Sequence, residues 1–195
     1  MSTSRLETFA DGVFAIAATL LILDVRTVGP DLGQSLLHIW PSYVGYAVSF
    51  FTIGIMWVNH HTVFEQIDRV DRRFLFINVG LLMCIAFVPF PTRLVALHIR
   101  DEGAKAATLA YGLTLTITAV FFSLLWFVGA LRGGLIKSDA DPRTVSGLSR
   151  TYWPGIVLYL AATLVALVSP GASAIMYAAI GLFYVLESSI FGRNV

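Results

Sequence analysis

Residues 5–26, RLETFADGVFAIAATLLILDVR, decide the fold, because they form a hydrophobic run of membrane-spanning length with an acid inside it. At about 1.5 Å per residue, a helix over this run is long enough to cross the hydrocarbon core of a bilayer. Asp11 lies near its start, and a carboxylate is costly in hydrocarbon unless it meets a partner. The run therefore predicts a membrane helix in which Asp11 contacts a polar group of another segment.

The same run has two different faces when it is placed on a helical wheel at roughly 100° per residue. Its bulky aliphatic side chains fall within about 60° of one another on that wheel: Ile16, Leu20 and Leu23. Thr19 and Gly12 flank them, and Asp11 falls roughly 140° from Ile16. One face thus carries an aliphatic row, and the other carries a polar group that needs partners.

The composition of the whole chain is that of an integral membrane protein. Hydrophobic residues make up 57% of the 195, charged residues make up 13%, and the mean hydropathy is +0.79. The apolar runs have helical length, and the alternating strands typical of a membrane barrel are absent, so the fold class is all-α. A net charge of +1 gives no basic surface for nucleic acid. Cys84 is the single cysteine, which excludes an intrachain disulfide and a multi-cysteine metal site.

The hydropathy predicts six transmembrane helices in one subunit that spans residues 1–195, with no room for a soluble domain. The helices are expected at about 5–25, 35–64, 73–96, 105–131, 150–169 and 171–191. Pro89 and Pro91 should bend the third.

An even number of helices puts both termini on one side of the membrane, and the basic residues indicate which side. With the N-terminus inside, nine of the 13 basic residues are cytoplasmic. We therefore expect a multi-pass protein of the inner (plasma) membrane with cytoplasmic N- and C-termini. The nine are Arg5, Arg69, Arg72, Arg73, Arg132, Lys137, Arg143, Arg150 and Arg193.

Polar side chains near the cytoplasmic ends of the first two helices should share one layer of the membrane. Asp11 lies about two turns into the first helix, and Arg5 precedes it. The second helix carries its polar residues one to three turns from its inner end: Trp57, Asn59, His60 and His61.

Three interpretations of this layer remain open: a structural clasp, a proton relay and a metal site. Adjacent helical positions point about 100° apart, so His60 and His61 are poorly placed to hold one ion together. We favour the clasp, in which the polar groups satisfy one another.

These motifs resemble the bacterial, single-repeat members of the transmembrane protein 175 potassium channel family. The resemblance rests on Arg5-x-x-x-Phe9-Ala10-Asp11, on the GVFAIAATLLILD that follows, and on Trp57-x-Asn59-His60-His61. It implies a homotetramer of six-helix subunits whose first helices surround a central pore, without a TVGYG selectivity filter.

The resemblance also implies roles for individual residues. The pore constriction falls on Ile16, with Leu20 and Leu23 as further hydrophobic layers toward the outside. The threonine layer that favours potassium falls on Thr19, where K⁺ would bind only transiently and no metal would be fixed. Arg5, Phe9 and Asp11 would hold the first helix against its neighbours, and Trp57, Asn59, His60 and His61 would complete that network. Ala10 departs from the family's usual serine.

The resulting hypothesis is a potassium-permeable, weakly selective, leak-type cation channel with a hydrophobic constriction. Its partners would be potassium, other monovalent cations, the lipid bilayer and further copies of itself, and it would need no cofactor. The rival hypothesis is a proton-coupled secondary transporter that uses Asp11, His60 and His61. An enzyme is disfavoured, because the chain has neither an HExxH nor a GxSxG motif.

Overall fold

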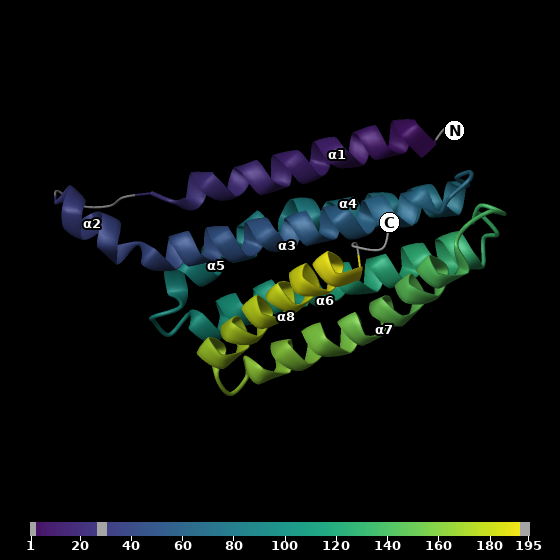
Figure 1. The fold of residues 1–195 in the computed structure, drawn as a ribbon. Helices are drawn as coiled ribbons and strands as arrows, with labels where there is room; N and C mark the ends of the chain where they lie inside the picture. The colour runs from purple at the N-terminus through teal and green to yellow at the C-terminus, as the bar shows by residue number, and fades with distance from the viewer. Residues whose placement is uncertain (1–2, 27–30, 192–195) are drawn as a thin grey trace.

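The computed structural model describes residues 3–26 and 31–191, with the side chains of residues 151 and 185–191 excepted. The described residues form helices joined by short loops (Figure 1). In chain order these are α1 Thr3–Leu20, η1 Leu21–Asp24, α2 Leu32–His38, α3 Trp40–Glu65, α4 Arg72–Phe87, α5 Pro89–His98, α6 Ala104–Leu124, η2 Leu125–Leu131, α7 Pro142–Val165 and α8 Pro170–Phe191.

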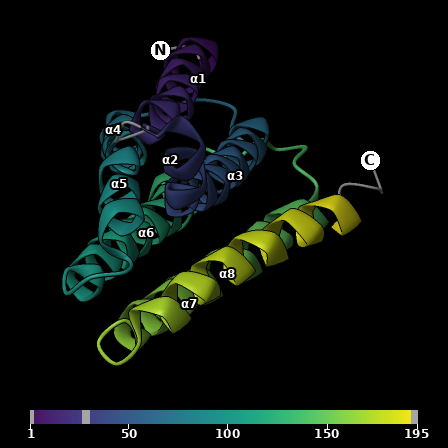
Figure 2. The ribbon, with the colours of Figure 1, turned by 90° about the vertical axis from the view of Figure 1, so that its left-hand side faces the viewer.

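Four of the helical segments are long and apolar enough to cross a membrane. They are Thr3–Asp24, Trp40–Glu65, Arg72–His98 and Ala104–Leu131, and the described part of α8, Pro170–Tyr184, is a shorter apolar helix. The all-helical membrane class expected from the composition is therefore confirmed. Helix α1 lies on one side of the bundle and the α7–α8 hairpin lies on the opposite side (Figures 1 and 2).

The third predicted helix is divided where its prolines stand. Helix α4 ends at Phe87, Val88 separates the two pieces, and α5 begins at Pro89. Proline lacks a backbone N–H, so Pro89 and Pro91 each remove one bond from the helical ladder. The break is local, because Thr92 N already donates to Val88 O at 3.2 Å.

The fifth helix begins earlier than expected, and the predicted second helix, 35–64, is divided near Ile39 into α2 and α3. Helix α7 starts at Pro142 rather than near residue 150, because Asp141 caps it: its carboxylate accepts from Arg143 N at 3.1 Å and Thr144 N at 3.3 Å. Helix α2 is capped in the same way by Asp31, which accepts from Gln34 N at 3.2 Å. Both caps lie in polar stretches that resemble loops in the sequence.

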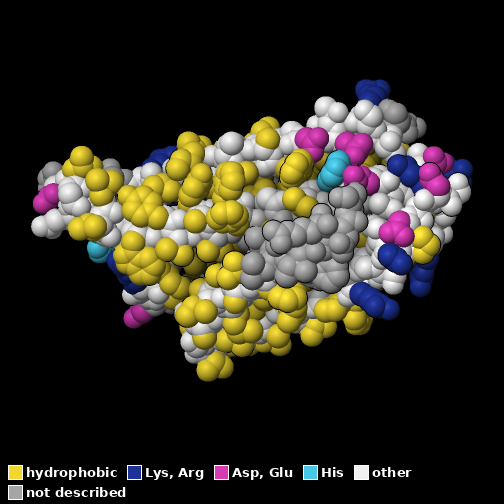
Figure 3. Space-filling view, viewed as in Figure 1, with side chains coloured by type: hydrophobic (Ala, Val, Ile, Leu, Met, Phe, Trp, Pro, Cys, Tyr) yellow, Lys and Arg dark blue, Asp and Glu magenta, His cyan; other side chains and the backbone are white. Residues whose placement is uncertain are grey.

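One end of the bundle carries most of the charged side chains, and we call it the basic end. It comprises the start of α1, the loop between α3 and α4 with the first turn of α4, and the segment between η2 and α7 with the first turns of α7 (Figures 1 and 3). The two connecting segments pair there, since Asp68 N donates to Leu135 O and Lys137 N donates to Gln66 O, both at 2.9 Å. Eight of the nine predicted cytoplasmic basic residues belong to this end, and Arg193 lies outside the described residues.

Polar side chains inside the bundle satisfy one another rather than face the surface. Ser49 Oγ lies 2.8 Å from Thr92 Oγ1 and 3.1 Å from Tyr111 Oη, which links α3, α5 and α6. Such interhelical hydrogen bonds supplement close packing where the surrounding lipid gives no hydrophobic drive to association. They hold the scaffold against which α1 packs.

Candidate functional site

Helix α1 buries one face against its own subunit and leaves the other face exposed. The buried side chains recur at helical spacing and pack toward α3 and α4: Leu6, Ala10, Phe14, Ala17 and Leu21. On the exposed face, Ile16 is 60%, Leu20 42% and Leu23 53% accessible. At about 100° per residue, the exposed row is centred roughly 110° from the buried one. The aliphatic row predicted as a pore face is thus largely exposed on the subunit.

Thr19 and Gly12 lie on the same exposed face as Ile16. The Thr19 hydroxyl lies 2.9 Å from Ala15 O and 3.0 Å from Ile16 O, so it donates its hydrogen to its own helix. Its oxygen lone pairs remain open on the exposed side. A side chain added at Gly12 would meet nothing within 4 Å. This face therefore presents oxygen acceptors and free space beside its aliphatic side chains.

Asp11 finds its partner on α3, as the polar contact expected from the sequence requires. The indole Nε1 of Trp57 donates to Asp11 Oδ1 at 2.8 Å. Both side chains are exposed on the subunit surface, with Trp57 43% accessible. The bond links α1 to α3 near the basic end, so it fixes the rotation of α1 about its own axis.

His60 points into the subunit and pairs with a residue that the sequence analysis overlooked. Its Nε2 lies 2.8 Å from Asn78 Oδ1 on α4, within hydrogen-bond distance. His60 is 2% accessible and Asn78 is fully buried. The imidazole also stacks on Phe64 and meets Phe14 of α1 edge-on, with ring centroids 4.4 and 5.4 Å apart.

The sequence does contain a signal for Asn78, because a polar side chain is unusual within an apolar run. It is an amide in the apolar run FINVGLLMCIAF, one and a half to two turns into α4 from the basic end. That depth matches the depth of His60, which lies a similar distance from the other end of the same loop. Its Nδ2 has no hydrogen-bond partner among the described residues.

The other predicted members of the polar network take no part in the Asp11–Trp57 hydrogen bond. His61 faces outward, stacks on Trp57 with ring centroids 6.2 Å apart, and lies 3.5 Å from Glu65. Asn59 lies near α7, and its backbone carbonyl accepts a hydrogen bond from Tyr152 Oη at 3.4 Å. Arg5 is in none of the ion pairs between described residues, and Phe9 is 57% accessible. The structure thus brings together Asp11 with Trp57, and His60 with Asn78.

The two histidines point to different sides of α3, as their adjacent positions predict. Among the side chains that the structure describes, no three from His, Cys, Asp or Glu gather in a way that could hold a metal ion. No hydrogen bond joins Asp11 to either histidine in this part of the chain.

Comparison with known proteins places the chain in a family. The family model described as endosomal/lysosomal potassium channel TMEM175 matches residues 5–89, which contain most of α1, the Asp11–Trp57 bond and the His60–Asn78 pair. A potassium channel of Chamaesiphon minutus is 37% identical over 195 residues, which covers 96% of this chain and 95% of that channel. The chain belongs to the TMEM175 family. The resemblance inferred from the first-helix motif is thereby confirmed.

The relatives of this chain are named either potassium channels or proton channels. The crystal structure of a lysosomal potassium-selective channel TMEM175 homologue from Chamaesiphon minutus superposes with a TM-score of 0.87 at 35% identity, covering 95% of this chain and 97% of that one. An endosomal/lysosomal proton channel TMEM175 of Gallus gallus is 32% identical over 143 residues, and this chain covers 28% of its length. The TMEM175 family is a family of channels and not of enzymes.

Proposed function

We propose that this chain is a potassium-permeable, weakly selective leak channel whose pore is lined by α1. Four copies would surround a central axis, each contributing the face that carries Ile16, Leu20 and Leu23. The observation that carries the proposal is that this face is exposed on the subunit and interleaves Gly12 and Thr19 with its aliphatic side chains, while the opposite face of α1 is buried. The family's named potassium channels support the substrate.

The proposed topology has six spans, of which α7 and α8 are the fifth and sixth. The basic end is cytoplasmic in this arrangement, because cytoplasmic loops of membrane proteins are enriched in Lys and Arg. The N- and C-termini then lie inside the cell, and the subunit resides in the plasma membrane.

Ile16 would form the gate of the proposed pore. Four isoleucine side chains around one axis make a neck that excludes water, and ions do not cross a dry neck. A small tilt or rotation of α1 would separate them and let the neck fill with water. Among the described residues α1 packs mainly against α3 and α4, with a smaller contact to α5, so such a movement would shift α1 against these helices.

Thr19 would give the pore its preference among ions. Its hydroxyl hydrogen is already donated to the α1 backbone, so the oxygen faces the pore as an acceptor and suits cations rather than anions. A ring of single hydroxyls replaces only part of an ion's hydration shell. Potassium sheds water more easily than sodium, so the preference for potassium is modest.

The polar cluster would support this pore rather than conduct. Asp11 bound to Trp57, and His60 bound to Asn78, fix α1 against α3 and α3 against α4. A proton-coupled transporter would need Asp11, His60 and His61 to exchange protons along one route. No hydrogen bond joins any two of these three groups in the described structure, which favours the supporting role.

Ion flux into liposomes tests the proposal against its rival. Purified full-length protein would be reconstituted without a pH gradient, and uptake of potassium, rubidium, caesium and sodium would be compared with protein-free liposomes. We expect passive uptake of all four ions, with potassium ahead of sodium. Uptake that requires a pH gradient would refute the channel and favour the transporter, and flux of protons alone would refute potassium permeation.

A further inference from the structure

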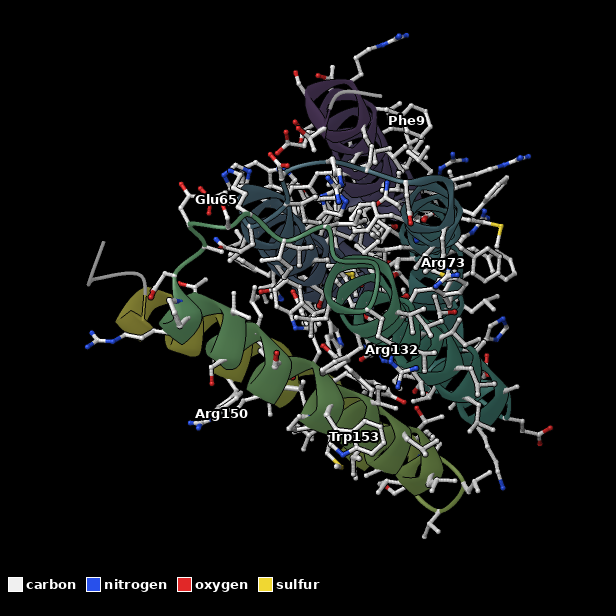
Figure 4. The ribbon with its side chains drawn as sticks, turned by 90° about the vertical axis from the view of Figure 1, so that its right-hand side faces the viewer. Phe9, Glu65, Arg73, Arg132, Arg150 and Trp153 are labelled. Atoms are coloured by element: carbon white, nitrogen blue, oxygen red, sulfur yellow. The ribbon has the colours of Figure 1, made fainter. Side chains whose placement is uncertain are left out.

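An open groove lies at the basic end, on the flank of the bundle away from α1. It has a volume of about 440 Å³ and lies between η2 and α7, lined by Phe127, Leu131, Arg132 and Trp153. Figure 4 shows Arg132 and Trp153 on this flank, far from Phe9 at the start of α1. The groove is therefore separate from the proposed pore.

We infer that this groove binds an anionic phospholipid, with the phosphate on Arg132 and the adjoining acyl chain along Phe127, Leu131 and Trp153. The inference rests on the proposed placement of the basic end at the membrane surface, but it does not depend on ion conduction.

The charge of the groove comes from Arg132. Its guanidinium is exposed, and none of the ion pairs between described residues includes it. No acidic side chain lines the groove. A guanidinium presents its N–H groups as a planar fork that fits two phosphate oxygens at once, so a phosphate complements this side chain in both charge and shape.

The depth of the lining residues matches the layers of a bilayer. Arg132 directly follows the membrane-length segment Ala104–Leu131, which puts its guanidinium at the level of lipid headgroups. Phe127 lies about 7–8 Å deeper, among the first acyl carbons. Trp153 is 68% accessible, and exposed tryptophans are typical of the boundary between headgroups and hydrocarbon. Polar and apolar parts of one lipid would meet matching side chains.

The wall that carries Arg132 is held in place before any lipid binds. Leu135 N donates to Ala130 O at 3.1 Å and closes the turn after η2, and Asp68 N ties that turn to the loop after α3. Gly129 packs so closely on Phe74 that an added Cβ would lie 2.9 Å from that ring. A fixed wall spares the ordering cost of binding, which distinguishes a site from a merely basic surface.

Lipid binding to the full-length protein tests the inference. Protein in a neutral detergent would be titrated with phosphatidylglycerol and with phosphatidylcholine, and bound lipid would be counted by native mass spectrometry. The variants are Arg132→Gln and Trp153→Ala, and the matched control is Arg143→Gln, an exposed arginine of the same end that does not line the groove. Because all three side chains are exposed, the variants should fold, and size-exclusion chromatography would verify it.

We expect phosphatidylglycerol to bind more tightly than phosphatidylcholine, and Arg132→Gln to weaken it about tenfold, with the control unchanged. Trp153→Ala should weaken both lipids alike, since it removes contact with the acyl chain. Equal loss in Arg143→Gln would show attraction to general surface charge and overturn the site. Displacement of the lipid by millimolar inorganic phosphate would assign the groove to free phosphate and overturn the lipid as its ligand.

Discussion

Replacement of Ile16 by asparagine should open the proposed neck. Burying an isoleucine side chain fully is worth about 1.5–3 kcal/mol. Ile16 is 60% accessible on the subunit, so wetting that part costs about 1–2 kcal/mol per subunit, and at most about 4–7 kcal/mol for four. Some of this surface would face neighbouring subunits. Even a quarter of that free energy for four subunits corresponds to roughly a tenfold increase in the fraction of channels whose neck is filled with water.

We expect the Ile16→Asn variant to remain folded. The part of Ile16 buried in its own subunit accounts for only about 1 kcal/mol. The assay is potassium flux into liposomes, with the amount of reconstituted tetramer matched between samples. The control is Ile22→Asn, which is 50% accessible and lies roughly 100° or more around the same segment from Ile16. We expect at least tenfold more flux for Ile16→Asn and little change for the control. Equal flux in wild type and Ile16→Asn, or an equal increase in both variants, would refute the assignment of the neck.

Three further predictions follow from separate contacts. Thr19→Val keeps the side-chain shape but removes the hydroxyl, so the reversal potential between potassium and sodium solutions should approach zero while flux persists; an unchanged potential would exclude Thr19 from selectivity. Trp57→Phe removes the donor to Asp11, which we expect to cost about 1 kcal/mol at this exposed site and to lower the tetramer fraction in size-exclusion chromatography, with selectivity intact. Gly112→Ala should lower the free energy of unfolding by about 1–3 kcal/mol, because the new Cβ would overlap the hydroxyls of Thr163 on α7 and Tyr177 on α8. Gly45→Ala is the control and should not lower it, because the nearest atom to its new Cβ is 3.6 Å away.

The hydrophobic lengths and periodicities in the sequence predicted most of this architecture. Residues 5–25, for example, correspond to α1 and η1, because a long apolar run has few ways to satisfy its backbone in lipid other than a helix. The start of α7 was less predictable, since the cap on Asp141 depends on local backbone geometry within a polar stretch. Helix ends are set by such single contacts, which composition does not reveal.

The candidate site divides in the same way. The helical wheel of the first helix placed Asp11 away from the Ile16 face, because helical geometry alone fixes the angle between these side chains. It did not identify the partners, which come from other helices: Trp57 for Asp11 could be expected from depth, but Asn78 for His60 depends on how α4 packs against α3. Depth in the membrane restricts which polar groups can meet, and the packing of helices selects among them.

Exposure by itself does not distinguish a pore face from a lipid face, but the kind of exposed side chain does. Helix α4 exposes Phe76 and Met83, at 66% and 68%, as expected for contact with acyl chains. The exposed face of α1 instead interleaves Gly12 and Thr19 with Ile16. A hydroxyl and an open backbone position gain nothing from lipid, whereas they fit a narrow axis shared by several helices, where small residues allow close approach and hydroxyl oxygens meet cations. This difference in composition between the two exposed faces is why we assign α1, and not α4, to the pore.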